Sequence, residues 1–123
     1  MSYTFLLLAG ISGAIGVALG AFGAHALKKR LSPERLQTFE TGVRYQMYHV
    51  AGLLSAAFVA EQWPGSSLPS LAGWFFLAGT VLFSGSLYLL VMTNKRWLGA
   101  ITPFGGLAFI AGWILLGLAG FIS

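Results

Sequence analysis

This 123-residue sequence lacks two residue types and contains few charged residues. There is no cysteine, which excludes disulfides, thiolate metal sites and cysteine nucleophiles. There is no aspartate, and the three acidic residues are all glutamates. Charged residues make up 8% of the chain, against about 25% in soluble domains. Because 57% of the residues are hydrophobic, too few polar side chains remain to cover a surface in water, and the sequence predicts a membrane protein.

Four apolar stretches follow one another along the chain and predict an all-α integral membrane protein with four transmembrane helices. The expected helices lie at about residues 3–27, 43–62, 70–92 and 98–122 of a single membrane domain, residues 1–123. Spanning ~30 Å of hydrocarbon takes about 20 helical residues. The second stretch is therefore short unless Arg44 extends its long side chain to the interface. Helices are expected because backbone polar groups in lipid must be bonded within their own segment.

A cleaved signal peptide is the alternative for the first stretch, since Ala24-His25-Ala26 has the small-x-small pattern of a cleavage site. Two features favour a retained helix instead. No Lys or Arg precedes the apolar run, and the run is longer than the core of a signal peptide. Lys28 and the two cations after it directly follow the run, as expected at the cytoplasmic end of a retained helix.

Every cation of the chain lies in or beside one of two connections between apolar stretches. These cations are Lys28, Lys29, Arg30, Arg35 and Arg44 in the first connection, and Lys95 and Arg96 in the second. Cytoplasmic loops are enriched in Lys and Arg, so both connections are predicted to be cytoplasmic and both termini to lie outside. We expect no nucleic-acid partner.

The first connection carries the signals of a helix start. Ser32 is a suitable N-cap, Pro33 suits the first helical position, and Glu34 complements the positive end of the helix. Apolar residues then recur at helical spacing, which predicts a short amphipathic helix over about residues 32–42 lying on the inner membrane surface. Gly42 is expected to bend the chain before the second membrane helix.

Glycines recur at helical spacing in the first and fourth stretches. The positions expected to mediate helix packing are Gly13, Gly16, Gly20, Gly23, Gly106, Gly112 and Gly117. Small residues let helices in lipid approach closely and pack by van der Waals contact. One interpretation is packing inside the monomer, and the other is an interface between copies in a homo-oligomer.

A cluster of polar residues is expected at similar depth on the cytoplasmic side. Its members are His25, Glu40, Arg44, Tyr45, Tyr48, His49, Ser84, Ser86, Tyr88 and Thr102. Polar groups at membrane depth are costly unless they are paired, so a shared hydrogen-bond network is the simplest interpretation. Glu40 precedes Arg44 by four residues, the favourable order for an ion pair along a helix. A ligand site or a lipid-headgroup site is the alternative.

The same residues lack the spacing of a metal or catalytic centre. His25, Glu40 and His49 are the nominal metal ligands, but no tight motif such as His-x-x-x-His occurs. No serine has a histidine and an acid in a nucleophile context, and no phosphate-binding loop is present. We therefore expect no cofactor, no metal and no enzymatic activity.

Three functional hypotheses remain open at this point. The first is a non-enzymatic, homo-oligomeric membrane protein that acts through helix packing, lipid contact or partner binding. The second is a small transporter or channel with a polar cytoplasmic vestibule. The third is a binder of anionic lipid headgroups, because Thr102-Pro103 predicts another helix N-terminus at the cationic face, and such ends favour anions.

Four ordered motifs of the chain resemble a known family. They are GAFGAH at residues 20–25, ETGVRYQMYH at 40–49, LFSGSLY at 82–88 and ITPFGG at 101–106. Together they are similar to the domain-of-unknown-function family 423, small bacterial inner-membrane proteins with eukaryotic relatives called transmembrane protein 256. The resemblance implies a multi-pass protein of the bacterial inner membrane. It supplies no activity, substrate or catalytic residue.

Overall fold

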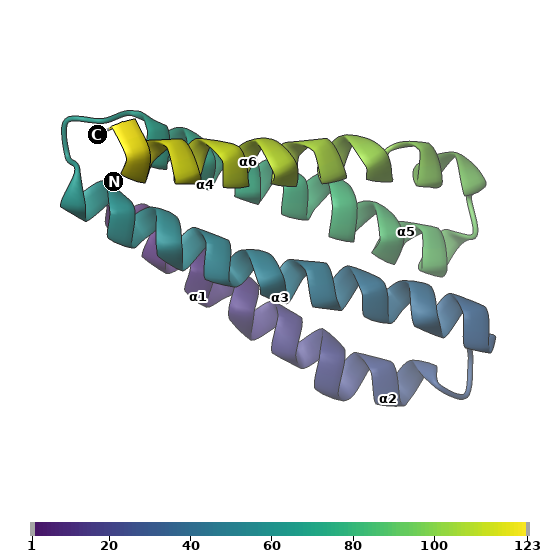
Figure 1. Cartoon of the computed structure of the whole chain (residues 1–123). Coiled ribbons are helices and arrows are strands. Elements are labelled where there is room, and N and C mark those ends of the chain that lie inside the picture. The colour runs from purple at the N-terminus through teal and green to yellow at the C-terminus, as the bar shows by residue number, and fades with distance from the viewer. Residues whose placement is uncertain (1, 123) are drawn as a thin grey trace.

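The computed structural model describes residues 2–122 as four roughly antiparallel helical rods. The first rod consists of α1 (Ser2–Ala18), the π-helix η1 (Leu19–Gly23) and α2 (Ala24–Leu27), and the second rod is α3 (Pro33–Gln62). The third rod consists of α4 (Leu68–Gly79), the π-helix η2 (Thr80–Ser84) and α5 (Gly85–Thr93). The fourth rod consists of the 3-10 helix η3 (Arg96–Ala100) and α6 (Thr102–Ile122). Both chain ends lie at the end of the bundle that carries the α3–α4 connection (Figure 1). The described part of the chain is therefore all-helical, as the sequence predicts.

Within residues 2–122, three stretches are long and apolar enough to cross a membrane. They are Tyr3–Leu27, Leu68–Thr93 and Arg96–Ile122. The second rod is not among them, because Gln46 and His49 on one side and Glu61 and Gln62 on the other flank the apolar part of α3. It nevertheless lies alongside the other rods, with contacts to α1, α4, α5 and α6.

The expected surface helix is not a separate element. Residues 33–62 form one helix, and Gly42 lies inside it without a break. The N-terminal signals are as predicted: Ser32 Oγ accepts a hydrogen bond from the Arg35 backbone N–H at 3.2 Å, and Pro33 is the first helical residue. Gly42 therefore does not separate a surface helix from a membrane helix, and it is buried where the Tyr88 ring approaches. A Cβ added to Gly42 would lie 2.7 Å from Tyr88 Cε1.

The fourth rod begins in two steps. Asn94 ends α5 in the left-handed conformation with φ 57°, and the short helix η3 follows before α6 starts at Thr102. The apolar segment before Pro103 is thus a separate helical turn rather than the start of one long helix.

The four predicted packing glycines of the first rod pack inside the monomer, whereas Gly10 has open space beside it. A Cβ added to Gly13 would lie 3.6 Å from Val50, and one added to Gly20 would lie 3.1 Å from Val43. Gly16 and Gly23 face α3 in the same way, against Met47 and Phe39. This ridge therefore brings α1 close to α3.

The glycines of α6 divide into two groups. An added Cβ at Gly112 would lie 2.6 Å from the Phe76 ring, and one at Gly105 would collide with the backbone nitrogen of Phe83 in η2. In contrast, Gly106 and Gly117 have open space where a side chain would be. Only the first group holds α6 against the third rod.

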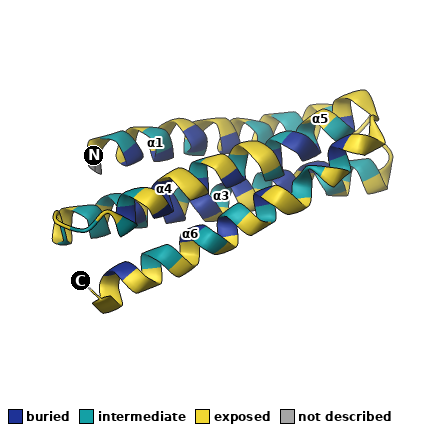
Figure 2. Cartoon of the chain, turned by 90° about the horizontal axis from the view of Figure 1, so that it is seen from above, coloured by how far each residue is buried: buried dark blue, intermediate teal, exposed yellow. Residues whose placement is uncertain are grey.

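The tightest part of the core lies toward the end of the bundle that carries the termini. It consists of Phe5, Ala9, Leu53, Ala56, Ala72 and Phe76, each at most 1% exposed. Figure 2 shows the buried faces of the rods turned toward one another and the exposed faces turned outward. Apolar side chains thus fill this half of the interior.

Candidate functional site

Gln46 is the centre of the polar contacts between rods. Its Nε2 donates a hydrogen bond to the Ser12 carbonyl at 2.8 Å, and its Oε1 accepts one from the Tyr88 hydroxyl at 2.6 Å. The side chain is 4% exposed. One buried amide therefore ties α3 to α1 on one side and to α5 on the other.

Two serines extend this network toward the fourth rod. Ser84 Oγ donates to the Gly42 carbonyl at 2.6 Å, and the Ser86 and Thr102 hydroxyls lie 2.6 Å apart. Ser84 and Ser86 flank the junction of η2 and α5. Hydroxyls from this junction thus bond to the backbone of α3 and to the start of α6.

Both ring nitrogens of His49 are occupied. Nδ1 lies 2.6 Å from the Tyr45 carbonyl, which can only accept, so Nδ1 carries the proton. Nε2 then accepts a hydrogen bond from Trp113 Nε1 at 3.0 Å. The imidazole stacks on Phe109 with ring centroids 3.4 Å apart and an angle of 4°. The ring is therefore neutral and has no lone pair free for a metal ion.

Arg35 fastens the beginning of α3 to the end of α5. Its guanidinium donates to the Val91 carbonyl, one of the carbonyls in the last turn of α5. Its Nε is buried and has no hydrogen-bond partner among the described residues. This contact places a cation at the negative end of a helix, where it is favourable.

Five predicted cluster members do not join the network through their side chains. Tyr45 contributes only its backbone carbonyl, and Tyr48 makes ring contacts alone. The other three lie apart from the network. His25, Glu40 and Arg44 are exposed, and Arg44 Nη2 donates to Thr41 Oγ1 at 3.2 Å. The expected ion pair between Glu40 and Arg44 is not present, as Arg44 bonds to Thr41 instead. Within residues 2–122 no three His or Glu side chains come close enough together to hold a metal ion.

Three of the remaining predicted members, Tyr45, Tyr48 and His49, line a groove between α3 and α6, which we call the α3–α6 groove. The other four, Ser84, Ser86, Tyr88 and Thr102, do not line it. The groove has a volume of about 460 Å³. Its lining consists of Tyr45, Tyr48 and His49 from α3, Phe83 from η2, and Gly106, Phe109, Ile110 and Trp113 from α6. Tyr45 stands edge-on to Tyr48 with ring centroids 5.4 Å apart, and lies 4.6 Å from the Phe83 ring. The groove wall is therefore almost entirely aromatic.

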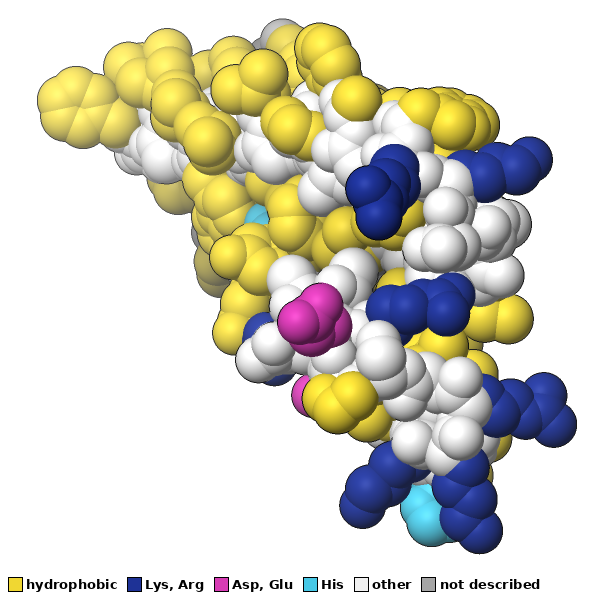
Figure 3. All heavy atoms as spheres, turned by 90° about the vertical axis from the view of Figure 1, so that its right-hand side faces the viewer, with side chains coloured by type: hydrophobic (Ala, Val, Ile, Leu, Met, Phe, Trp, Pro, Cys, Tyr) yellow, Lys and Arg dark blue, Asp and Glu magenta, His cyan; other side chains and the backbone are white. Residues whose placement is uncertain are grey.

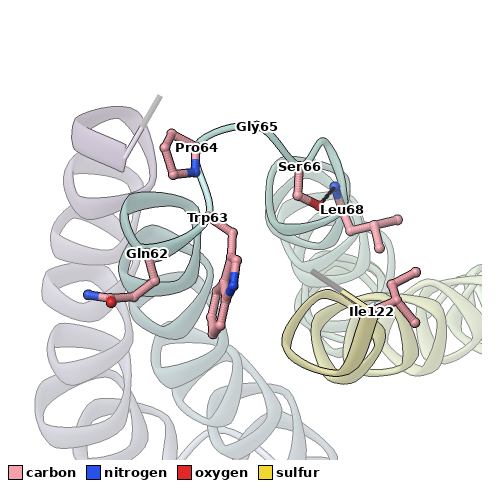
Figure 4. A pocket seen from close by; sticks show the side chains of 7 residues that line it. All are labelled: Gln62, Trp63, Pro64, Gly65, Ser66, Leu68 and Ile122. Carbon is pink, nitrogen blue, oxygen red and sulfur yellow. Dashed lines mark hydrogen bonds between the residues drawn. The ribbon is translucent and has the colours of Figure 1, made fainter.

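A second cavity of about 480 Å³ lies at the opposite end of the bundle, where the chain termini meet the α3–α4 connection. Trp63 and Pro64 line one side, and Leu68 and Ile122 lie close together on the other (Figure 4). Ser66 Oγ accepts a hydrogen bond from the Leu68 N–H at 3.3 Å and so holds this connection. No member of the predicted polar cluster lies here.

Several residues of the network were missed at the sequence level. Gln46 and Trp113 make central hydrogen bonds, and Phe109 stacks on His49. One available signal was the spacing of Gly42, Gln46 and His49 by four and three residues, which places them on a single face of α3. Trp113 gave no comparable signal, because an aromatic residue in a membrane helix is ordinary.

Comparison with known proteins places the chain in a family. The family described as "Protein of unknown function (DUF423)" matches residues 19–106. The membrane protein YwdK of Bacillus subtilis is 49% identical over 115 residues, covering 94% of each chain. The membrane protein SH2409 of Staphylococcus haemolyticus is 46% identical and covers 91% of this chain and 90% of its own. The inner membrane protein YgdD of Escherichia coli K12 is 43% identical, covering 90% of this chain and 84% of its own.

The names of the relatives and the apolar helices of this chain both indicate a membrane protein. All three are named as membrane proteins of the group UPF0382, and YgdD as an inner membrane protein. No solved structure matches the chain. The location in the bacterial inner membrane is thereby established, and the chain belongs to the DUF423 family of membrane proteins, whose function is unknown.

Proposed function

We propose that the protein crosses the membrane four times, with the second part of α3 as the fourth span. From Arg44 to Gln62, α3 rises about 28 Å, close to the ~30 Å of hydrocarbon in a bilayer. Lys and Arg side chains gather at the end of the bundle opposite the termini (Figure 3). The rule that cytoplasmic loops are positive supports an arrangement with both termini outside.

Within this topology, we propose a non-enzymatic role carried by the surfaces that meet lipid and partners. The observation that carries this proposal is that the central polar groups bond to one another or to helix backbone. Gln46, Ser84 and His49 all have partners on another rod or on their own helix. Groups occupied in this way hold helices together, and the chemistry left for binding lies on the outside of the bundle.

A channel or transporter is supported less well. A path through the bundle would have to continue through the half that carries the termini, where Phe5, Leu53 and Phe76 are fully buried among apolar neighbours. Those side chains provide no polar group to replace water around an ion. A proton path would also need the unprotonated nitrogen of His49, Nε2, but this atom already accepts a hydrogen bond from Trp113.

The exterior offers two kinds of contact. The cationic end is suited to anionic phospholipid headgroups, which attract Lys and Arg at the inner surface. The open glycines Gly106, Gly117 and Gly120 of α6 leave room for a helix of a second copy. Lipid contact and self-association are therefore both part of the proposal.

The test compares the purified full-length chain in nanodiscs of phosphatidylcholine alone with nanodiscs containing phosphatidylglycerol. We expect the anionic lipid to raise the unfolding temperature, and we expect liposomes containing the protein to show background ion and proton flux. An unfolding temperature that is independent of lipid charge would overturn the lipid-contact role. A flux abolished by His49→Ala would favour a transporter instead. Strictly monomeric protein in native membranes, measured by cross-linking, would remove self-association.

A further inference from the structure

We propose that the α3–α6 groove is a binding site for one anionic phospholipid, with an acyl chain in the groove and the phosphate at Arg44. This inference rests on the proposed lipid-contact role and names the site where that contact is specific. It depends on three features: the shape of the groove, the polar groups at its inner end, and the hydrogen bonds that already engage the ring N–H groups of His49 and Trp113 at its floor.

The groove has room for a chain rather than for a bulky group. Gly106 has open space where a side chain would lie, and it forms the low point of the wall. From Gly106 to Trp113, α6 rises about 10 Å, which is the length of wall available to an extended hydrocarbon. Phe83 and Ile110 complete apolar walls that such a hydrocarbon contacts by dispersion.

The polar end of the groove lies on the cationic side of the bundle. Arg44 and Tyr48 are four residues apart on α3 and share a face, with Tyr45 beside them. Arg44 is exposed, and its recorded partner is the neutral Thr41 hydroxyl rather than a carboxylate. The hydroxyls of Tyr45 and Tyr48 have no hydrogen-bond partner among residues 2–122. A phosphate here receives a guanidinium and two hydroxyl donors.

The floor of the groove accepts only an apolar occupant. His49 and Trp113 are its polar side chains, and each uses its ring N–H in a hydrogen bond within the protein. The floor therefore has no free donor to offer, and it suits the hydrocarbon part of a ligand. The groove is thus cationic at its inner end and apolar along the rest of its length. This arrangement complements a phospholipid, which has an anionic headgroup and an apolar acyl chain.

Charge favours a lipid over a second copy as the occupant. Copies in one membrane share the same orientation, so a neighbour would bring its own cationic end next to Arg44. Like charges in a partly apolar setting repel, whereas an anionic headgroup neutralises them.

The experiment is native mass spectrometry of the full-length protein released from nanodiscs containing equal amounts of phosphatidylglycerol and phosphatidylcholine. We expect the wild type to retain one phosphatidylglycerol per chain. Gly106→Leu fills the groove and should abolish this adduct, whereas Gly117→Leu, at an equally open position of α6 outside the groove, should retain it. Arg44→Gln should weaken retention about tenfold, which corresponds to about 1.4 kcal/mol, near the lower limit for a hydrogen bond to a charged group. Arg96→Gln, at another exposed cation, is its control.

If Gly106→Leu fails to fold, Arg44→Gln still tests the site, because Arg44 is exposed and its hydrogen bond is to Thr41 on the same helix. Equal retention of both lipids by the wild type would overturn the site. So would unchanged retention in Gly106→Leu and Arg44→Gln, or a dimer without lipid that Gly106→Leu dissociates. If the unfolding temperature still depends on lipid charge in that case, the groove assignment alone fails. If that dependence is also missing, the proposed lipid-contact role fails with it.

Discussion

Two adjacent glycines of α6 provide a direct test of how the fourth rod is held. A methyl group added to Gly105 would collide with the backbone of Phe83, which cannot move without displacing η2. The same group added to Gly106 meets nothing within 4 Å. Replacing Gly by Ala within a helix is worth about 1 kcal/mol in propensity. Overpacking a tight contact costs about 1–3 kcal/mol.

Both variants gain the same helix propensity from the change of glycine to alanine. The difference between their free energies of unfolding therefore measures the cost of the collision at Gly105 alone. We expect Gly105→Ala to be less stable than Gly106→Ala by roughly 1–3 kcal/mol, the cost of overpacking. Gly106→Ala itself should be at least as stable as the wild type. The assay is reversible unfolding in mixed micelles with increasing sodium dodecyl sulfate, followed by helical circular dichroism. Equal free energies of unfolding for the two variants would refute the close contact between α6 and η2.

Three further predictions follow from the polar contacts. Gln46→Leu should lower the free energy of unfolding by about 1–3 kcal/mol, because it leaves the Tyr88 hydroxyl without its partner. Adding Tyr88→Phe should recover part of this loss in the same micelle assay, and an additive loss would contradict the contact. Nitrogen-15 NMR of histidine-labelled protein should show His49 neutral with its proton on Nδ1; a proton on Nε2 would exclude the bond from Trp113. Arg35→Gln should lower the unfolding temperature and Arg96→Gln should not, since only Arg35 bonds to the end of α5.

The membrane character and the helical fold were predictable because they depend on composition and on local signals. The charge scarcity, the long apolar runs and the start of α3 at Ser32 and Pro33 all act within a few residues. The same holds for the helix start expected at Thr102-Pro103, because α6 begins at Thr102. Local physical chemistry was sufficient for these features.

The unpredicted features depend on contacts between distant parts of the chain. Gly42 was interpreted as a bend because glycine weakens helices, but here it makes room for Tyr88, which lies 46 positions later in the sequence. Glu40 and Arg44 have the spacing of an ion pair, yet both are exposed, where such pairs contribute little. The glycine spacing indicated a packing ridge on the first rod but not that its partner would be α3.

The π-helix η2 determines which way the part of the third rod that follows it, α5, faces. Each turn of π-helix contains an extra residue compared with α-helix, so everything after it is rotated by about 100° around the rod axis. Ser86 and Tyr88 follow η2 and reach the fourth and second rods, respectively. Deleting one residue from η2 would keep the span long enough for a membrane while turning both hydroxyls toward different neighbours. The extra residue of η2 thus sets the rotation of the hydrogen-bonded segment α5 relative to the apolar segment α4 of the same rod.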